Sequence, residues 1–381
     1  MKRGVKALLE KWNESHKWSS ARANEVVEYI RVDSPRIWER PPLDIVNVAN
    51  GLLNLKTREL KPHDHEFLSP IQLPVAYDPT ATCHQWEKFV SEVFPEDAHD
   101  LAWELPAWLM VPDTSIQKVP LLVGEGANGK STYLVAVGAF LGIANVSAES
   151  LHRLESDRFA VAQLVGKLAN ICPDLPSKCL EGSSMFKALT GGDRVTAEYK
   201  FRQAFAFVPY ARLLFSANHL PRSDDASYAY FRRWLIVPFL RTFDDNEQIP
   251  SEVLNARLAA PSELSGVLNK ALIAPNAIHA RRGLLQSKSI RKAGSEFVRL
   301  TDPVAVWLKE VIVRQPNRMV AKSALLEAYN RTARRENRPP ITRTGLGLAV
   351  KRVMPGIEEA QRELDGKRCW VWLGVKLVDQ G

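Results

Sequence analysis

Residues 119–132 read VPLLVGEGANGKST and contain the pattern G-x-x-x-x-G-K-[ST], which is typical of a phosphate-binding loop. The apolar run at 121–123 predicts a buried strand before the glycines, and residues 131–137 predict a helix after them. Glycines let the backbone turn so that successive N–H groups point at phosphate oxygens, and the start of the helix adds partial positive charge. This context favours a nucleotide site over a glycine-rich turn before an ordinary helix.

The residue types in this loop predict specific contacts. Lys130 is expected to reach the β- and γ-phosphates of a nucleoside triphosphate, and Ser131 to offer its hydroxyl to Mg²⁺. The nucleotide-binding residues predicted from the motif are Gly124, Glu125, Gly126, Ala127, Asn128, Gly129, Lys130, Ser131 and Thr132.

Composition and charge indicate a globular protein with a basic tail. The chain has 381 residues, of which 45% are hydrophobic and 25% charged, so two or three domains are expected. Its net charge of +8 is uneven, because residues 281–381 contain 21 Lys and Arg against 10 Asp and Glu. A basic segment beside a phosphate-binding loop suggests nucleic acid as a partner, and a solubilising surface is the alternative.

Cysteine usage and hydropathy further narrow the class of protein and the compartment expected for it. The four cysteines form no C-x-x-C pair and have no His cluster beside them, so reduced thiols in a cytoplasmic protein are expected. No apolar run approaches 18 residues, and no long apolar segment follows the basic N-terminus. The sequence therefore predicts neither a membrane partner nor a secretory signal.

Two predicted strands after the loop end in polar residues that suit phosphate chemistry. The strand at 167–173 ends at Asp174, where a carboxylate can bind Mg²⁺ or polarise the attacking water; a loop Asp or a helix cap is the alternative. The apolar strand at 212–217 ends at Asn218, whose amide can orient that water or sense the γ-phosphate, unless it is a turn residue.

Two arginines precede a further apolar strand. Arg232 and Arg233 stand directly before WLIVP at residues 234–238. Such arginines can act as a finger toward the phosphates of a neighbouring subunit, and a surface salt-bridge pair is the alternative.

Residues 186–208 are rich in glycine, basic residues and aromatic residues. They predict a β-hairpin whose tip presents Lys200, with Arg194 and Arg202 near it. Interleaved basic and aromatic residues suit single-stranded nucleic acid, because charge follows the phosphates and rings contact bases or sugars. An ordinary surface hairpin is the alternative.

As an ordered set, these segments resemble a known family. The order is GEGANGKST, KLANICPDLP, LTGGDRVTAEYKFRQAFAFVP, LLFSANHLP and FRRWLIVPF. It is similar to the superfamily 3 helicases, in the form found at the C-terminal end of phage, plasmid and poxvirus primase-helicases, over roughly residues 44–245. The resemblance implies ATP and Mg²⁺, a homo-oligomeric ring that is usually a hexamer, and 3′→5′ movement on single-stranded or forked DNA.

The resemblance also implies roles for single residues. Asp174 matches the acid of the second motif, Asn218 the polar sensor, and Arg232 or Arg233 the finger, with Arg232 preferred. Residues 190–200 match the motif that forms a DNA-contacting hairpin in the channel of the ring.

The second motif departs from the family pattern. The family usually carries acids in a more apolar strand, whereas here Pro173 precedes a single acid, Asp174. Glu181 or Asp193 could therefore contribute to polarising the water.

The tail is similar to the winged-helix segment that often follows this core. Helices are predicted at 302–308, 322–329 and 342–350, and a strand for the wing at 370–375. In a helix-turn-helix, basic residues between the second and third helices meet phosphates or the groove. Five arginines lie there: Arg331, Arg334, Arg335, Arg338 and Arg343. A subunit-contact domain with a basic surface is the alternative.

The predicted fold is α/β: a P-loop (AAA+-like) ATPase core with a mainly helical N-terminal collar region and a C-terminal winged-helix domain. The N-terminal region also contains a predicted β-hairpin with an Asn50-Gly51 turn. The predicted domains are 1–84 for the collar region, 85–250 for the ATPase, 251–294 for a helical segment with a linker at 281–294, and 295–381 for the basic winged helix. No primase-polymerase domain fits in residues 1–110, so a stand-alone helicase, priming by a separate primase and a fragment stay open.

The predicted function is an ATP-dependent DNA helicase of phage- or plasmid-type replication in the cytoplasm of a bacterial host. The first alternative is a replication initiator that binds DNA under the control of ATP but does not unwind it. The second is a P-loop ATPase that acts on protein.

Overall fold

A parallel β-sheet lies at the centre of the molecule. The computed structural model describes residues 2–176, 182–221, 223, 225, 227–336, 338–364 and 366–378. Within them, the strands of this sheet are ordered β10-β4-β9-β6-β5 and all neighbours are parallel. Their bounds are β4 (Val119–Val123), β5 (Val146–Ser147), β6 (Ala169–Cys172), β9 (Arg212–Ala217) and β10 (Trp234–Pro238). The strands predicted before the phosphate-binding loop, Asp174 and Asn218 are thus confirmed as β4, β6 and β9.

Helices cover both faces of the sheet, as its apolar strands require. One face packs against α3 (His84–Val93), α4 (His99–Leu109), α5 (Lys130–Leu141), α10 (Ser251–Leu258) and α11 (Pro261–Arg281). The other packs against α6 (Leu151–Ser156), α7 (Arg158–Ala162), α8 (Ser184–Gly191), α9 (Tyr228–Phe231) and α12 (Lys288–Thr301). Neighbouring residues of β4 face opposite ways: Leu122 joins the first core and Leu121 the second.

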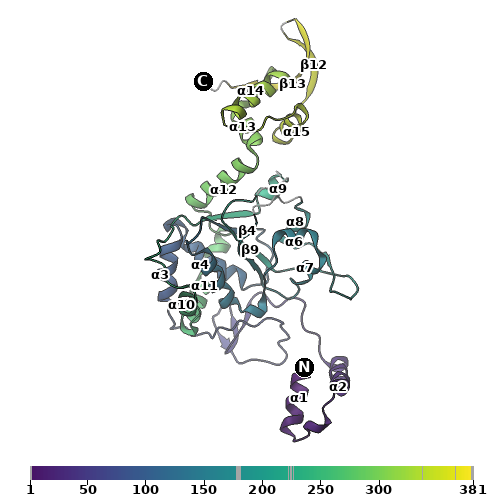
Figure 1. Cartoon of the computed structure of the whole chain (residues 1–381), viewed down its shortest axis with the longest axis vertical. Coiled ribbons are helices and arrows are strands. Elements are labelled where there is room, and N and C mark those ends of the chain that lie inside the picture. Colours follow the sequence, from purple (N-terminus) through teal and green to yellow (C-terminus); the bar gives the residue numbers. More distant parts are fainter. Residues whose placement is uncertain are drawn as a thin grey trace.

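The N-terminal region lies at one end of the molecule (Figure 1). Helices α1 (Lys2–Lys11) and α2 (Ser20–Asp33), with the short 3₁₀ helix η1 (Ser15–Lys17) between them, stand apart from the sheet. The predicted hairpin follows as β1 (Ile45–Val48) and β2 (Gly51–Asn54), with Val48 opposite Gly51, and β3 (Leu60–Lys61) pairs with β2. Two more 3₁₀ helices, η2 (Glu96–Ala98) and η3 (Ile143–Asn145), belong to the body.

The C-terminal domain lies at the opposite end and has its own core (Figure 1). It runs α13 (Pro303–Val311), β11 (Ile312–Ala321), α14 (Lys322–Arg335), α15 (Arg343–Val353), β12 (Glu359–Leu364) and β13 (Lys367–Leu377). In the part of the domain that the structure describes, its strands form an antiparallel sheet in the order β11-β13-β12. The three helices and the strand predicted in the tail are therefore present.

The linker expected at residues 281–294 is only partly a loop. Helix α12 begins at Lys288, and its buried Phe297 lies edge-on to Phe231 and Trp234, with ring centroids 5.7 and 6.1 Å away. A linker was expected at residues 281–294, but Ile290 and Phe297 give α12 an apolar face that the body of the molecule buries.

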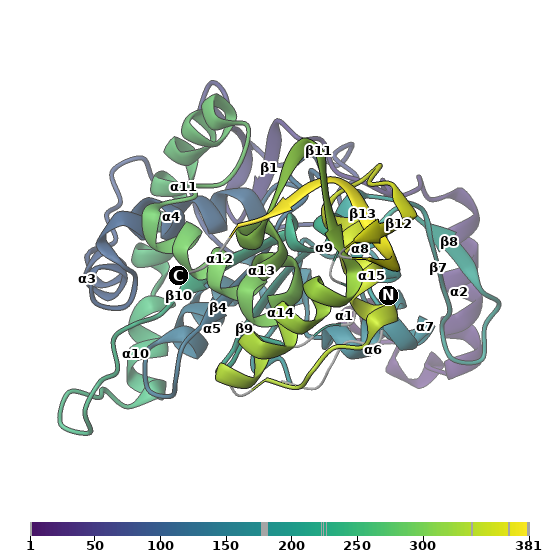
Figure 2. The ribbon, with the colours of Figure 1, turned by 90° about the horizontal axis from the view of Figure 1, so that it is seen from above.

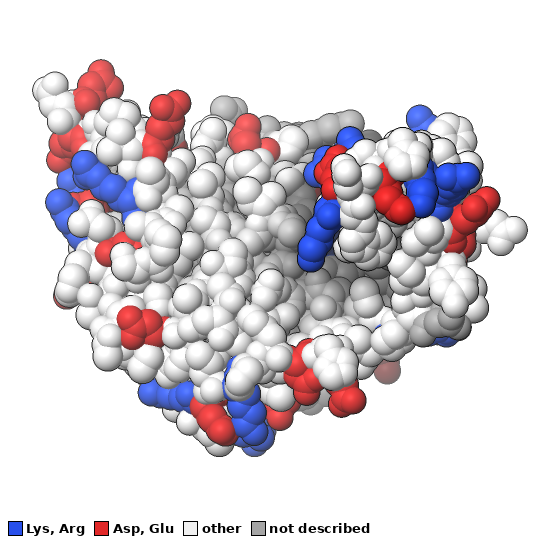
Figure 3. All heavy atoms as spheres, turned by 90° about the horizontal axis from the view of Figure 1, so that it is seen from below, with Lys and Arg blue, Asp and Glu red and all other residues white. Residues whose placement is uncertain are grey.

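Charge is distributed unevenly over the molecule. On the face seen from the side of α1 and α2, Lys and Arg lie among Asp and Glu in small groups around a broad uncharged area (Figure 3). The basic excess of residues 281–381 lies mostly in the C-terminal domain at the far end. Across the ranges that the structure describes, no helix has the length and hydropathy needed to cross a bilayer.

Candidate nucleotide-binding site

The phosphate-binding loop connects the end of β4 to the start of α5. Gly129 caps α5 with φ of 84°, a conformation that favours glycine. Gly124 has no room for a side chain, because a Cβ atom there would lie 2.3 Å from the carbonyl oxygen of Phe239. The chain after β10 also returns to the loop, where the Phe243 N–H donates to the Ala127 carbonyl at 2.9 Å. The loop is therefore held in shape by neighbours on both sides.

Lys130 lies inside the curve of this loop. Its ammonium group donates to the carbonyl oxygens of Gly124 at 2.6 Å and Glu125 at 2.9 Å, and to Asn128 Oδ1 at 2.9 Å. Burial lowers the pKa of Lys130, and the negative charge of Asp174 partly opposes this shift. Ser131 is exposed in the first turn of α5. The loop thus gathers a cation, a hydroxyl and a helix N-terminus, which together suit a polyphosphate.

Asp174 and Asn218 lie at the same edge of the sheet as the loop. Asn218 follows β9, which pairs directly with β4, and Asp174 follows β6, one strand further on. With neighbouring strands about 4.8 Å apart, Asn218 is about one strand spacing from the loop and Asp174 about two.

The backbone at Asp174 is tied to the neighbouring strand. Asp174 has φ of 58°, and its N–H donates to Ser216 Oγ at 3.3 Å, while the Leu175 N–H donates to the Ser216 carbonyl at 2.7 Å. Left-handed backbone is uncommon outside glycine, although Asp tolerates it better than most residues. The two bonds to buried Ser216 fix where β6 ends and hence where the carboxylate projects.

A cleft of about 1160 Å³ opens beside the start of the loop. Gly124, Glu125 and Asn218 line one side, and the opposite side comes from α12 and the C-terminal domain, including Tyr329 and Arg338. The predicted sensor residue therefore faces open space next to the loop.

The two arginines before β10 have different environments. Arg233 is 8% exposed, and its Nε donates to Thr190 Oγ1 at 2.7 Å while Nη1 donates to the Ala229 carbonyl at 2.5 Å. Arg232 is exposed and donates from Nη2 to Gln117 Oε1 at 2.6 Å. Only Arg232 of the pair is therefore presented to a neighbouring molecule.

Arg232 lies at the other edge of the sheet from the loop. Strands β10 and β4 are parallel with Trp234 opposite Val119, so residues before β10 and the loop after β4 are separated by the full strand length. Five residues of strand correspond to about 16 Å. Arg232 therefore does not reach the loop of its own chain.

The alternative acids are placed less favourably. Asp193 lies near Arg233, whose pKa is lowered first by burial and then by Arg232 while the charge of Asp193 opposes the shift, so Asp193 belongs to the edge away from the loop. Glu181 falls outside the described residues. Among the predicted acids that the structure describes, Asp174 is the one beside Lys130.

The structure offers a fit for Mg²⁺ of the kind found in phosphate sites. Among the described residues, no group of three or more His, Cys, Asp or Glu side chains could hold a metal ion by itself. Mg²⁺ in nucleotide sites usually takes one or two protein oxygens and completes its shell with phosphates and water. Ser131 and Asp174 match that requirement.

The predicted hairpin is present as β7 (Val195–Ala197) and β8 (Phe205–Phe207), and Figure 2 shows it at one edge of the molecule. Lys200 and Arg202 lie in its exposed tip, and Lys200 Nζ lies 5.1 Å from the centre of the Phe201 ring. Arg194 is not near them, because it precedes Val195 at the base, where Val195 pairs with Phe207. A β-strand separates base from tip, by about 10 Å at three residues.

Phe201 is a residue that the sequence interpretation did not single out. Its side chain is 92% exposed at the tip of the hairpin, beside Lys200. Tyr199 and Phe205 stack behind it with ring centroids 5.0 Å apart. The signal in the sequence was an aromatic residue between two basic ones, which does not by itself reveal which ring is free.

The sheet, the loop and the polar residues at its carboxyl edge define a P-loop α/β protein. Residues 4–95 match a family described as "D5 N terminal like", and residues 122–233 match a "Family of unknown function (DUF5906)". Two A-form apo structures of the C-terminal region of NrS-1 are similar to the chain, with TM-scores of 0.53 and 0.51 and identities of 12% and 11%. Each match covers 93% of this chain and 90% of the other.

These matches confirm the resemblance that the order of motifs indicated. The similarity to the two family models includes the N-terminal helices as well as the segment from β4 to Arg233. At 11–12% identity, the likeness to the NrS-1 structures shows a shared fold.

Proposed function

We propose that the protein is an ATP-dependent DNA helicase that works as a ring, with each ATP bound between two copies of the chain. The observation that supports this most directly is the position of Arg232 at the edge of the sheet opposite the phosphate-binding loop. An arginine finger must reach the transferred phosphoryl group. A second copy that places its Arg232 against Asn218 and Lys130 would complete the site.

The N-terminal helices support self-association. Several large apolar side chains of α1, of α2 and of the turn after α1 are exposed, and these helices stand apart from the body. They are Leu8, Trp12, Val26, Tyr29, Ile30 and Val32. Exposed apolar patches mark interaction sites, and a collar formed by neighbouring copies would cover these side chains. A hexamer is the ring size we infer from the resemblance.

Residues of this chain would divide the catalytic work as follows. The N–H groups of residues 124–132 and the Lys130 ammonium bind the β- and γ-phosphates. Asp174 accepts a proton from, or orients, the attacking water, and Asn218 positions that water against the γ-phosphate. Ser131 and Asp174 would hold Mg²⁺, which supplies charge neutralisation at the phosphates.

The β7–β8 hairpin is the proposed contact with single-stranded DNA. Lys200 and Arg202 would follow the phosphates, and the free ring of Phe201 would stack on a base or sugar. Movement of this hairpin with each hydrolysis step would carry the strand through the ring, with the 3′→5′ polarity that the resemblance implies.

The C-terminal domain has the order of helices and strands of a winged helix, and we infer that it binds duplex DNA at the fork. A groove of about 390 Å³ lies between α15 and the β12–β13 hairpin, lined by Arg343, Lys351 and Trp370 among others. In helix-turn-helix domains, the second helix of the motif lies in the major groove. The resemblance places this activity in phage or plasmid replication in a bacterial cytoplasm.

This groove also favours the alternative of a replication initiator that binds DNA without unwinding it. Strand displacement on a forked duplex with labelled strands separates the two functions. We expect displacement with ATP and Mg²⁺, none with a non-hydrolysable analogue, and hydrolysis that single-stranded DNA stimulates. ATP hydrolysis without displacement would support the initiator, and hydrolysis that DNA does not stimulate would support an ATPase acting on protein.

A further inference from the structure

Helix α8 lies between the nucleotide sensor and the DNA-contacting hairpin. It follows Ser183 and ends at Gly191, four residues before β7 begins at Val195. Phe186 and Leu189 are buried in the core on one face of the sheet. Ser183, Lys187 and Thr190 are spaced four and three residues apart, so they lie on another, common face of the helix.

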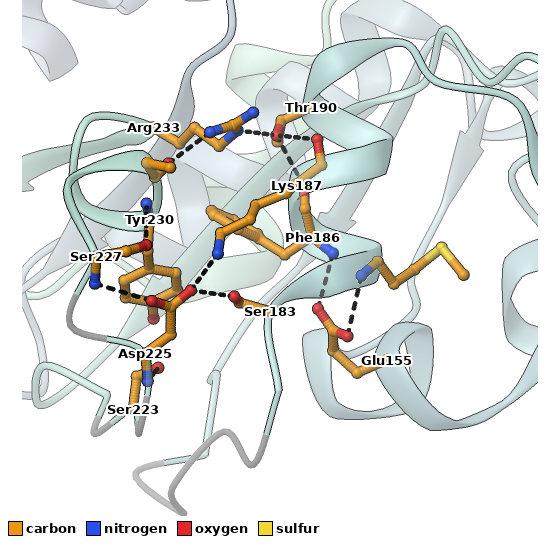
Figure 4. Close-up of polar contacts among 12 residues, drawn as sticks. Glu155, Ser183, Phe186, Lys187, Thr190, Ser223, Asp225, Ser227, Tyr230 and Arg233 are labelled. Atoms are coloured by element: carbon orange, nitrogen blue, oxygen red, sulfur yellow. Dashed lines mark hydrogen bonds and ion pairs between the residues drawn. The ribbon is translucent and has the colours of Figure 1, made fainter.

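The first contact of this polar face is with the segment that follows Asn218. Lys187 Nζ lies 2.5 Å from Asp225 Oδ2, and the Ser183 hydroxyl donates to the same oxygen (Figure 4). The Ser227 N–H donates to Asp225 Oδ1 at 2.8 Å. Asp225 is seven residues after Asn218 on the chain. The helix therefore contacts Asp225, and through it Ser227, between β9 and α9.

Asp225 is an anion under ordinary conditions. Burial alone would raise its pKa, but hydrogen bonds from Lys187, Ser183 and Ser227 outweigh burial and hold the pKa well below its usual range. The side chains of Lys187 and Asp225 are 32% and 17% exposed. The pair is thus a partly buried, charge-assisted contact rather than a solvated one.

The second contact is with the strand that carries the candidate finger. Thr190 accepts a hydrogen bond from Arg233 Nε at 2.7 Å and donates its own to the Phe186 carbonyl at 2.7 Å (Figure 4). Arg233 is directly followed by β10 and preceded by Arg232. One helix thus contacts both the sensor segment and the neighbour of Arg232.

The ends of α8 are also fixed. Glu155 of α6 accepts hydrogen bonds from the N–H groups of Met185 at 3.2 Å and Phe186 at 2.7 Å (Figure 4). At the other end, the Asp193 N–H donates to the Ala188 carbonyl at 3.0 Å. Only Arg194 lies between Asp193 and the start of β7 at Val195. A displacement of the helix would therefore be passed to the base of the hairpin.

We propose that α8 couples the nucleotide site to the β7–β8 hairpin, with Lys187 as the positioning residue that makes the hairpin follow the sensor segment. This rests on the proposed function, because it assumes that Asn218 senses nucleotide and that the hairpin contacts DNA. Lys187 belongs to α8 and lies outside both the phosphate-binding loop and the hairpin. The alternative is that the Lys187–Asp225 pair only stabilises the fold.

Hydrogen–deuterium exchange of the full-length protein tests the coupling. The wild type should show a change in exchange at residues 195–207 when a non-hydrolysable ATP analogue and Mg²⁺ are added. Lys187→Met should bind the analogue yet lose this response, and Lys187→Arg should restore it. No response in the wild type, or an unchanged response in Lys187→Met, overturns the proposal.

Lys270→Met is the matched control. Lys270 Nζ pairs with Glu87 Oε1 at 2.8 Å and joins α11 to α3, on the other face of the sheet. Loss of this ion pair should leave the hairpin response intact. If Lys270→Met abolishes the response as Lys187→Met does, the effect is general destabilisation and the coupling role is rejected.

Stimulation of ATP hydrolysis by single-stranded DNA gives an independent readout. We expect Lys187→Met to keep basal hydrolysis and lose stimulation by about fivefold or more, the size of a typical coupling between sites. Full stimulation in this variant overturns the proposal. Strand displacement by the wild type is measured separately. A nucleotide-dependent change in exchange at the hairpin without strand displacement would refute the helicase function and leave the proposed coupling unaffected.

Discussion

The two edges of the parallel sheet differ in what they present. The carboxyl edge carries the phosphate-binding loop, Asn218 and Asp174, all aimed at one region beside Lys130. The amino edge carries Arg232, with Lys118 donating to its carbonyl at 2.6 Å. The residues proposed to bind and to sense the nucleotide are thus on one side, and the exposed arginine is on the other.

This difference follows from the topology of parallel strands. The carboxyl ends of neighbouring parallel strands all lie at one edge of the sheet. Residues that directly follow these strands therefore lie near one another at that edge. A residue that precedes a strand is necessarily placed at the other edge, about a strand length away. The sheet therefore places the phosphate-binding loop and Arg232 of one chain at opposite edges, and predictions about the two edges can be made separately.

The largest effect is expected from the carboxyl edge. Lys130→Ala removes the ammonium group proposed to bind the β- and γ-phosphates, so ATP hydrolysis should fall to background. Steady-state hydrolysis with saturating ATP measures this. Lys167→Ala is a matched control, because Lys167 precedes β6 at the amino edge and only donates to the Ala144 carbonyl; its hydrolysis should stay near wild type. Hydrolysis retained in Lys130→Ala would reject the site.

A nearly equal loss of ATP hydrolysis is expected from a substitution at the amino edge, if that edge of a neighbouring copy supplies the arginine finger. Arg232→Ala should lower hydrolysis by about 10³-fold, the lower end of the effect of an arginine finger. Mixing Arg232→Ala with Lys130→Ala subunits should restore part of the activity, because some interfaces then pair an intact loop with an intact Arg232. Absence of recovery in the mixture, with mixed rings verified, would contradict a finger acting between copies.

Asn218→Ala should have a smaller effect at the carboxyl edge. Loss of one positioned polar group costs about 10²-fold in kcat, and the KM for ATP should change little because the loop and Lys130 are intact. Single-turnover hydrolysis compared with nucleotide binding separates the two quantities. A large rise in KM with unchanged kcat would assign Asn218 to binding instead of sensing.

Arg233→Met should affect stability more than chemistry. The substitution removes the donors to Thr190 and the Ala229 carbonyl at a buried position. Leaving buried acceptors unpaired costs about 1–3 kcal/mol, which lowers the Tm by about 2–10 °C for a domain of this size. Thermal unfolding measures the change in Tm. Mixing Arg233→Met with Lys130→Ala subunits should restore no more ATP hydrolysis than the same mixture made with subunits that keep Arg233.

Much of the fold could be predicted because its signals are local. Apolar runs such as 121–123 and 212–217 followed by polar residues indicated parallel strands, and the Asn50-Gly51 pair indicated a hairpin. The segment at 288–301 was missed as a helix packed on the body, because its many basic residues resemble a linker. Phe297 is buried against Phe231 and Trp234, and Ile290 joins the core of the other face, so the burial of both depends on residues distant in the sequence.

The sequence predicted the residues of the candidate site but not how they are grouped in space. The motif identified Lys130, and strand ends identified Asp174 and Asn218. The sequence could not decide between Arg232 and Arg233, which alternate in direction before β10 so that one is buried and one is exposed. Nor could it reveal that Lys187 pairs with Asp225, since 37 residues and the strands β7, β8 and β9 lie between them.

The smallest effect concerns the charges within the carboxyl edge. Burial lowers the pKa of Lys130, and the charge of Asp174 opposes that shift. A lowered pKa means that the ammonium group is lost at a lower pH than in free lysine, so nucleotide affinity should fall as pH rises through that pKa. Asp174→Asn removes the opposing charge, lowers the pKa of Lys130 further and should move this alkaline decline to lower pH.

Binding of a fluorescent ATP analogue without Mg²⁺, titrated across pH, measures the decline without requiring hydrolysis. Asp193→Asn is the matched control, because the charge of Asp193 acts on Arg233 at the other edge of the sheet. A shift of the decline in Asp174→Asn alone would place Asp174 electrostatically beside Lys130 and keep the two edges independent. Equal shifts in both variants would mean that the charge of Asp193 also affects Lys130 across the sheet. The phosphate-binding loop and Arg232 would then be separated by distance but not electrostatically.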